Sequence, residues 1–153
     1  MKSKPVRASR TILSDLMSPP DANISGSVFG GKILAMVDKA AAVCAMRHSG
    51  KPCVTVAMER VEFLIPIHVG DWVSVEAQVN CVGTTSLEIG VEVYAENSAK
   101  GTRRHANTCL VTMVAVDNKG KPSQVPGLIL ETPQEKGRHA AALERRKVRA
   151  RAA

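Results

Sequence analysis

One carboxylate, Asp38, stands in the middle of a long apolar segment and is the residue of this sequence best placed to do chemistry. From Ile33 to Met46 the only charged residues are Asp38 and Lys39. Burying a lone charge is costly, so such a carboxylate must be paired, solvated or protonated. Two uses are open: a structural aspartate bonded to a neighbouring strand or to Lys39, and a general base or nucleophile in catalysis.

A glycine pair at the start of the same segment adds a second chemical feature. Gly30 and Gly31 precede the apolar run, which ends near Gly50. The length of the run and the absence of proline predict a buried helix over about residues 30–48. Free N–H groups at the start of a helix favour a developing oxyanion, and glycine lets a substrate approach the backbone there. At about 1.5 Å per residue, Asp38 lies roughly 10 Å further along the axis, so a carbonyl held at one chain's glycines is expected to meet a partner chain's Asp38.

Histidine and cysteine offer no comparable site. The histidines are His48, His68, His105 and His139, and the cysteines are Cys44, Cys53, Cys81 and Cys109. The histidines have no mutual spacing that suggests a site and are expected to be surface or structural residues. The cysteines form no C-x-x-C pair and have no ligand-like spacing to a histidine, so free buried thiols are expected and a metal is not. No G-x-S-x-G motif supports a serine triad.

Composition and charge describe one domain with a basic end. The 153 residues are 44% hydrophobic but only 3% aromatic, and no apolar run is long enough to span a bilayer. The N-terminus lacks the apolar core of a signal peptide, so a cytoplasmic protein is expected. From Lys136 onward, seven basic residues and one acidic residue carry +6 of the net charge of +7. Such a tail can contact nucleic acid or an anionic surface, but a solvated end is the favoured interpretation.

The remaining segments predict the elements that hold Asp38 in place. Strand-like patterns cover residues 11–17, 53–65, 71–81, 87–93 and 105–116. One strand, a buried helix and four antiparallel strands predict an α+β fold, in which a curved antiparallel sheet of about five strands wraps a long central helix. A phase shift near Glu59-Arg60 predicts a bulge, and the open edges of the sheet favour edge-to-edge dimerisation. The predicted divisions are a basic flexible arm at 1–10, a domain at 11–122, and a linker with a basic Ala/Arg/Lys-rich tail at 123–153.

Five motifs in order give residues 11–122 a family resemblance. They are DANISGSVFGGKI at 21–33 with MVD at 36–38, VTVAME at 54–59, FLIP at 63–66 with VGD at 69–71, VGTTSLEI at 82–89, and VAVD at 114–117. The sequence resembles the hotdog-fold acyl-CoA thioesterases, and most of all the bacterial short-chain acyl-CoA thioesterases and the cytosolic acyl-CoA hydrolases. In that fold the long helix lies inside the curved sheet, and residues 11–122 are the expected thioesterase domain.

The resemblance implies roles for residues in three segments. Asp38 matches the family's catalytic acid residue, and Asn23 matches an asparagine that acts across the interface from the other subunit. With Gly30 and Gly31 as the oxyanion site, these residues are the expected catalytic set. The expected substrate-binding residues are Phe29, Val82, Gly83, Thr84, Thr85 and Ser86. The loop from Val82 to Ser86 either cradles part of coenzyme A or is simply a hairpin connection, and the family often has an arginine where this chain has Thr84.

The same resemblance implies how the protein works and assembles. It implies hydrolysis of fatty acyl-CoA to free acid and coenzyme A, with no cofactor beyond the coenzyme A of the substrate. It also implies a homodimer, with three dimers forming a hexamer. Two alternatives stay open: a hotdog hydratase, against which the lack of a histidine near the Asp38 motif argues, and a non-catalytic module that binds acyl-CoA or, less favoured, nucleic acid.

Overall fold

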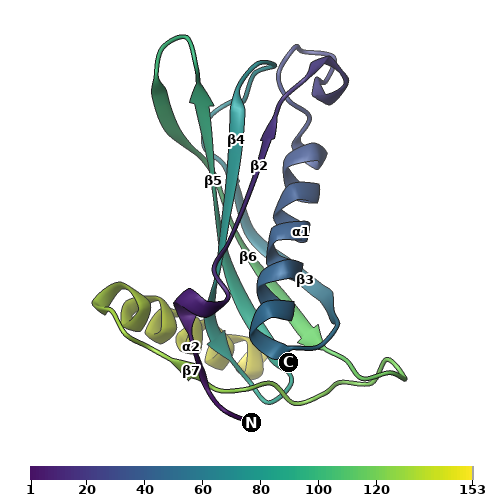
Figure 1. Ribbon diagram of the computed structural model, residues 1–153, viewed down its shortest axis with the longest axis vertical. Helices are drawn as coiled ribbons and strands as arrows, with labels where there is room; N and C mark the ends of the chain where they lie inside the picture. The colour runs from purple at the N-terminus through teal and green to yellow at the C-terminus, as the bar shows by residue number, and fades with distance from the viewer. Residues whose placement is uncertain (153) are drawn as a thin grey trace.

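A curved five-stranded sheet wraps the long helix α1 (Gly30–Ser49), and a second helix, α2 (Pro133–Ala152), crosses the opposite face of the sheet (Figure 1). This computed structural model describes residues 1–152. The predicted fold class, one long helix inside a curved antiparallel sheet, is confirmed. Neither helix of the described residues is long and apolar enough to cross a membrane.

The sheet is antiparallel throughout, with its strands in the order β2-β4-β5-β6-β3. These strands are β2 (Thr11–Leu16), β3 (Cys53–Phe63), β4 (Trp72–Val82), β5 (Ser86–Asn97) and β6 (Thr102–Ala115). A short parallel pair joins β1 (Lys4–Pro5) to β7 (Leu128–Ile129), and two 3-10 turns cover Val6–Ala8 and Pro19–Asp21. The edges of the main sheet are therefore β2 and β3, and β3 is the first strand after α1 in the chain.

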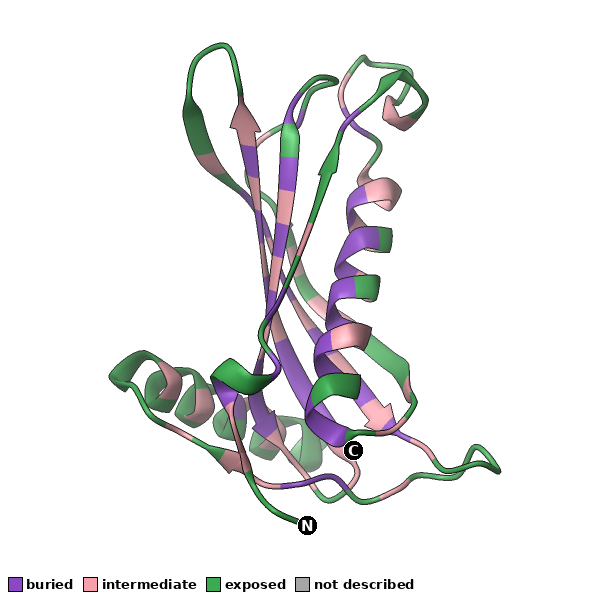
Figure 2. Ribbon diagram, viewed as in Figure 1, coloured by how far each residue is buried: buried purple, intermediate pink, exposed green. Residues whose placement is uncertain are grey.

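The core lies between α1 and the inner face of the sheet. Alternate residues of β4 and β5 point inward and are fully or almost fully buried, and the side of α1 that faces them is buried too (Figure 2). The alternation arises because successive side chains of a strand point to opposite faces. At its end, α1 stops at Gly50, whose φ of 69° is left-handed and whose N–H donates to the carbonyl of Met46. Glycine adopts that conformation without steric cost, which explains where the helix ends.

The edge strand β3 is irregular at two places. Its pairing with β6 shifts register between Glu59 and Glu62, where Arg60 has a φ of 54°. That shift is the bulge that the sequence pattern predicted. A second shift lies between Thr55 and Ala57, and the alternation of apolar residues gave no sign of it.

Both ends of the chain are packed onto the domain, which corrects two expectations. Residues 1–10 were expected to be a flexible arm, but Val6 is 3% exposed, Ser9 is fully buried, and β1 pairs with β7. The basic tail was expected to be solvated, but α2 buries Ala142 and turns Arg145 onto the sheet. Hydrophobic periodicity could not show either contact. Among residues 1–10 the only buried hydrophobic side chain is that of Val6, and α2 meets the sheet through the charge of Arg145.

Candidate active site

Asp38 lies half-buried on α1, and one of its oxygens is bonded to the inner face of β3. Thr55 Oγ1 donates to Asp38 Oδ1 at 2.6 Å. Thr55 points inward because it pairs with Met113, a buried residue of the core. Among residues 1–152, Asp38 has no other hydrogen bond or ion pair, so its second oxygen, Oδ2, is open and no pair with Lys39 forms. The sequence predicts a hydrogen bond to a neighbouring strand for a purely structural aspartate, and Thr55 makes such a bond. It occupies only Oδ1, so Oδ2 is available for chemistry.

The start of α1 is flanked by the only two phenylalanines of the chain. A Cβ at Gly31 would lie 2.3 Å from the Phe29 ring, and a Cβ at Gly30 would lie 3.3 Å from the Phe63 ring. Both rings are more than half exposed. Phe29 is the N-cap but offers no side-chain cap, so the first N–H groups of the helix stay available to a ligand. A side chain at position 31 would therefore displace the Phe29 ring, and the two phenylalanines make an apolar entrance to a potential anion site.

Asn23 lies in the loop before α1 and is held by that loop. Its Oδ1 accepts from the N–H and the hydroxyl of Ser25 at 2.9 and 2.7 Å, and its Nδ2 donates to Ser27 Oγ at 3.2 Å. The loop itself is anchored because the N–H of Val28 donates to the carbonyl of Ile67. None of the hydrogen bonds of Asn23 reaches Asp38, so one chain does not bring these two predicted residues together.

The predicted substrate loop, residues 82–86, lies near the other end of α1. The Gly83 N–H donates to the Ser86 carbonyl at 2.8 Å, which closes a tight turn between β4 and β5. The carbonyls of Thr84 and Thr85 accept from Val125 and Ala115. In one chain, therefore, the predicted site residues occupy three places: the start of α1, its middle and the loop beside its end (Figure 1).

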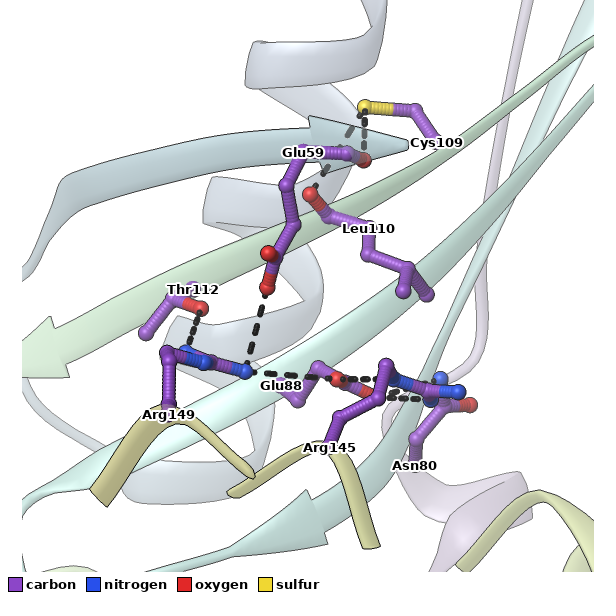
Figure 3. Close-up of polar contacts among 8 residues, drawn as sticks. All are labelled: Glu59, Asn80, Glu88, Cys109, Leu110, Thr112, Arg145 and Arg149. Carbon is purple, nitrogen blue, oxygen red and sulfur yellow. Dashed lines mark hydrogen bonds and ion pairs between the residues drawn. The ribbon is translucent and has the colours of Figure 1, made fainter. Parts of the chain in front are cut away.

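A buried ionic network joins α2 to the outer face of the sheet (Figure 3). Arg145 donates from Nε and Nη2 to the two oxygens of Glu88 at 2.9 and 2.7 Å, and Asn80 Nδ2 donates to the same carboxylate at 2.9 Å. Arg149 reaches Glu59 at 3.1 Å. Burial raises the pKa of Glu88, but the hydrogen bonds from Arg145 and Asn80 and the nearby positive charges outweigh it, so that pKa lies below its usual value. These arginines face the protein, which leaves fewer cations for a nucleic acid than the sequence suggests.

The histidine and thiol groups near the core are structural. His48 Nε2 lies 2.9 Å from the carbonyl oxygen of Pro126, and burial lowers the pKa of this histidine. Burial raises the pKa of Cys44 to about 12 and that of Cys109 to about 11, so neither thiol is a ready nucleophile. Within residues 1–152, no three His, Cys, Asp or Glu side chains gather closely enough to hold a metal ion.

Comparison with known proteins places this geometry in a family. The sequence model of the "Thioesterase superfamily" matches residues 25–102, slightly more than half of the chain. The chain belongs to the thioesterase superfamily. An uncharacterized acyl-CoA thioester hydrolase of Bacillus subtilis, YkhA, is 38% identical over 91% of this chain and 81% of its own length.

Two solved thioesterase structures resemble the whole chain. The apo form of a hexameric acyl-CoA thioesterase is 40% identical, with a TM-score of 0.95 over 99% of this chain and 97% of the other. An acyl-CoA hydrolase from Staphylococcus aureus, solved with butyryl coenzyme A, coenzyme A and coenzyme A disulfide, is 34% identical, with a TM-score of 0.88 over 97% and 92%. The similarity extends beyond residues 11–122, so both packed ends belong to the shared architecture.

Three structural partners were missing from the sequence analysis. Thr55 could have been found from the sequence, because it is the one polar residue among the first apolar residues of its strand and alternates with them toward the inner face of the sheet. Phe63 carries no such signal, because its contact with Gly30 spans more than thirty residues of chain. Arg145 is one of several arginines in the tail, and nothing local distinguishes the one that meets Glu88.

Proposed function

We propose that the protein hydrolyses acyl-CoA thioesters, with Asp38 as the group that activates water or attacks the thioester. The observation that supports this most strongly is the carboxylate itself, which is held by Thr55 through one oxygen and is open at the other. The family supports the reaction class, and the relatives named above are acyl-CoA hydrolases. The reaction as proposed uses no cofactor beyond the coenzyme A of the substrate, and we place it in the cytoplasm.

The chemistry needs one base and one oxyanion site. As general base, Asp38 Oδ2 takes a proton from water, the water oxygen bonds to the thioester carbon, and the carbonyl oxygen becomes an oxyanion. The first N–H groups of α1, at Gly30 and Gly31, hold that oxyanion. The C–S bond then breaks, and the coenzyme A thiolate receives the proton held by Asp38. As nucleophile, the same oxygen bonds to the carbon and expels the thiolate, and water hydrolyses the resulting anhydride. Both routes use the open oxygen.

The site as proposed needs two chains. Gly30 and Asp38 are separated by about 12 Å along α1 at about 1.5 Å per residue, so they cannot hold one carbonyl together. The edge strand β3 exposes the apolar side chains of Val54, Val56 and Phe63, which a second copy would cover. We therefore propose a homodimer that joins its sheets at this edge, with Asn23 and the helix entrance from one chain and Asp38 from the other. The hexamer of the apo thioesterase supports a trimer of such dimers.

Two substitutions test the catalytic assignment. Asp38→Asn should lower thiol release from acyl-CoA by about 10²–10⁴, the usual cost of losing a general base. Asp117→Asn is the matched control, because Asp117 lies in an exposed turn. Its Oδ1 accepts from the backbone N–H groups of Lys119 and Lys121, and an amide oxygen can accept the same two hydrogen bonds. A folded Asp38→Asn protein with wild-type turnover would remove Asp38 from the reaction.

Subunit mixing tests the shared site. Asn23→Ala and Asp38→Asn, each nearly inactive alone, should regain activity when the two variants exchange subunits. With equal amounts and random exchange, about half of the dimers are mixed, and each holds one intact site, so about a quarter of wild-type activity should return. If mass spectrometry shows exchange and no activity returns, the two residues do not form one site across the interface.

A further inference from the structure

Lys32, the third residue of α1, joins three segments of the chain at the start of that helix. Its Nζ lies 3.1 Å from Asp15 Oδ2 on β2 and 3.5 Å from Asp21 Oδ1, in the 3-10 turn that precedes the loop of Asn23. Asp15 points toward α1 because its cross-strand partner, Val73, is fully buried in the core. One ammonium therefore connects the edge of the sheet, the start of the helix and the loop between them (Figure 1).

Asp21 transmits this ion pair to the loop that holds Asn23. The Asp21 carbonyl accepts from the N–H of Phe29 at 2.8 Å, which closes the loop at its base. The other carboxylate oxygen, Oδ2, accepts from the N–H and the hydroxyl of Ser18 at 2.8 and 3.1 Å, so Oδ1 is the oxygen that faces Lys32. The position of Asn23 relative to α1 thus depends on where Asp21 lies.

The cluster of these three side chains has a single cation. Among the ion pairs of residues 1–152, Lys32 is the only partner of Asp15 and the only partner of Asp21. The contact with Asp15 raises the pKa of Lys32, and the hydrogen bonds from Ser18, together with Lys32, lower the pKa of Asp21, so the pair stays charged at neutral pH. Without the ammonium, the two carboxylates would repel each other across the place where Lys32 now lies.

We propose that Lys32 is a positioning residue of the thioesterase site, which holds the loop of Asn23 in register with the entrance of α1. This role rests on the proposed function, in which Asn23 and the N–H groups of Gly30 and Gly31 come from one chain. Two carboxylates already match the charge of Lys32, so it acts through position and does not itself supply charge to the oxyanion. Its ion pairs constrain the helix turn that offers the oxyanion donors, where a misplacement of about 1 Å can cost about 100-fold in rate.

Steady-state hydrolysis of acyl-CoA measures the effect. Lys32→Met keeps the length of the side chain and removes its charge, and it should lower kcat about 10- to 100-fold with KM within about threefold. Lys32→Arg should recover most of kcat, because a guanidinium can pair with both carboxylates. Asp21→Asn breaks the pair from the side of the loop, keeps an oxygen for Ser18 and should also lower kcat. Lys147→Met is the matched control, since Lys147 pairs with Glu144 at 3.3 Å on α2 and should keep wild-type kcat.

Hydrogen exchange tests the position of the loop without relying on hydrolysis. The N–H groups of Phe29 and Asn23 donate to the carbonyls of Asp21 and Ser27. In peptides followed by mass spectrometry, these groups should exchange several-fold faster in Lys32→Met than in the wild type, because the base of the loop opens more often. Peptides from the middle of α1 should exchange at the wild-type rate in both proteins.

Subunit mixing assigns the side of the shared site on which Lys32 acts. A mixture of Lys32→Met and Asp38→Asn should rise toward a quarter of wild-type activity. One site of each mixed dimer then takes its loop and entrance from the chain with Lys32 and its carboxylate from the other chain. A mixture of Lys32→Met and Asn23→Ala should regain nothing beyond the residual activities, because every site lacks one of the two residues.

The outcomes separate this role from the proposed function. Wild-type kcat in Lys32→Met, no recovery in Lys32→Arg, or unchanged exchange of the loop would each overturn the role. So would a mixture of Lys32→Met and Asp38→Asn that stays inactive where Asn23→Ala and Asp38→Asn recover together. If the wild type releases no thiol from acyl-CoA but the loop of Lys32→Met exchanges faster, the ion pairs hold the loop and the hydrolase is rejected.

Discussion

Replacing Thr55 by valine removes the one hydrogen bond that the described residues give to Asp38. Thr55 Oγ1 lies 2.6 Å from Asp38 Oδ1 and 3.3 Å from Met113 Sδ. A hydroxyl has one proton, and the shorter contact to a carboxylate oxygen takes it. Valine keeps the branched shape and suits an edge strand, so the fold should tolerate the change. The substitution therefore tests Thr55 as a positioning residue that acts through Asp38.

The size of the effect follows from the charge on the acceptor. A hydrogen bond to a charged group contributes about 1.5–3 kcal/mol, and each 1.36 kcal/mol in the barrier changes a rate tenfold. If the bond holds Asp38 in its reactive orientation, Thr55→Val should lower kcat by about 10- to 150-fold. KM should change little, because Thr55 touches the carboxylate and not the substrate. Release of the coenzyme A thiol, followed with a chromogenic disulfide across a range of acyl-CoA concentrations, separates the two constants.

Two companion variants show whether the hydroxyl is responsible. Thr55→Ser keeps the donor and should recover most of kcat, whereas Thr112→Val removes a threonine hydroxyl from the outer face of the sheet and should have little effect. Wild-type kcat in a folded Thr55→Val protein would refute the positioning role. Equal losses in the serine and valine variants would show that packing of the methyl group matters and that the hydrogen bond does not.

The network under α2 gives two stability predictions. Arg145→Ala leaves the carboxylate of Glu88, whose side chain is 3% exposed, with one hydrogen bond from Asn80 and one long ion pair to Arg149 at 3.9 Å, and should lower the free energy of unfolding by about 3 kcal/mol. The exposed pair of Lys147 and Glu144 is the control, and Lys147→Ala should change it by less than about 1 kcal/mol in the same denaturant titration. Because the pKa of Glu88 is lowered by folding, its stabilisation is present above its ordinary pKa of 4.5 and is lost as pH falls through the folded value. Glu88→Gln should therefore be less stable than the wild type at neutral pH and approach it in acid, and parallel curves from pH 7 to pH 3 would contradict this origin.

The elements predicted best were those specified by local chemistry. The helix from Gly30 to Ser49 follows from an uninterrupted apolar run, and its end follows from Gly50, the residue that adopts a left-handed conformation without strain. The strands β4 and β5 follow from strict alternation, because one face of each packs on the core and the other does not. These signals span a few residues, so they can be read without knowing the rest of the chain.

The contacts that were missed join residues far apart in the sequence. Asp38 was recognised as unusual, but its partner Thr55 lies on another element, and the register of β3 against β6 decides that it faces inward. The ion pairs of the C-terminal tail could not be predicted for the same reason, because their partners are also far apart in the sequence. Arg145 and Arg149 lie on one face of α2, and Glu59 and Glu88 lie on the outer face of β3 and β5, the two strands on either side of β6. Hydrophobic periodicity does not detect a helix that docks through arginines, so the tail resembled a solvated end.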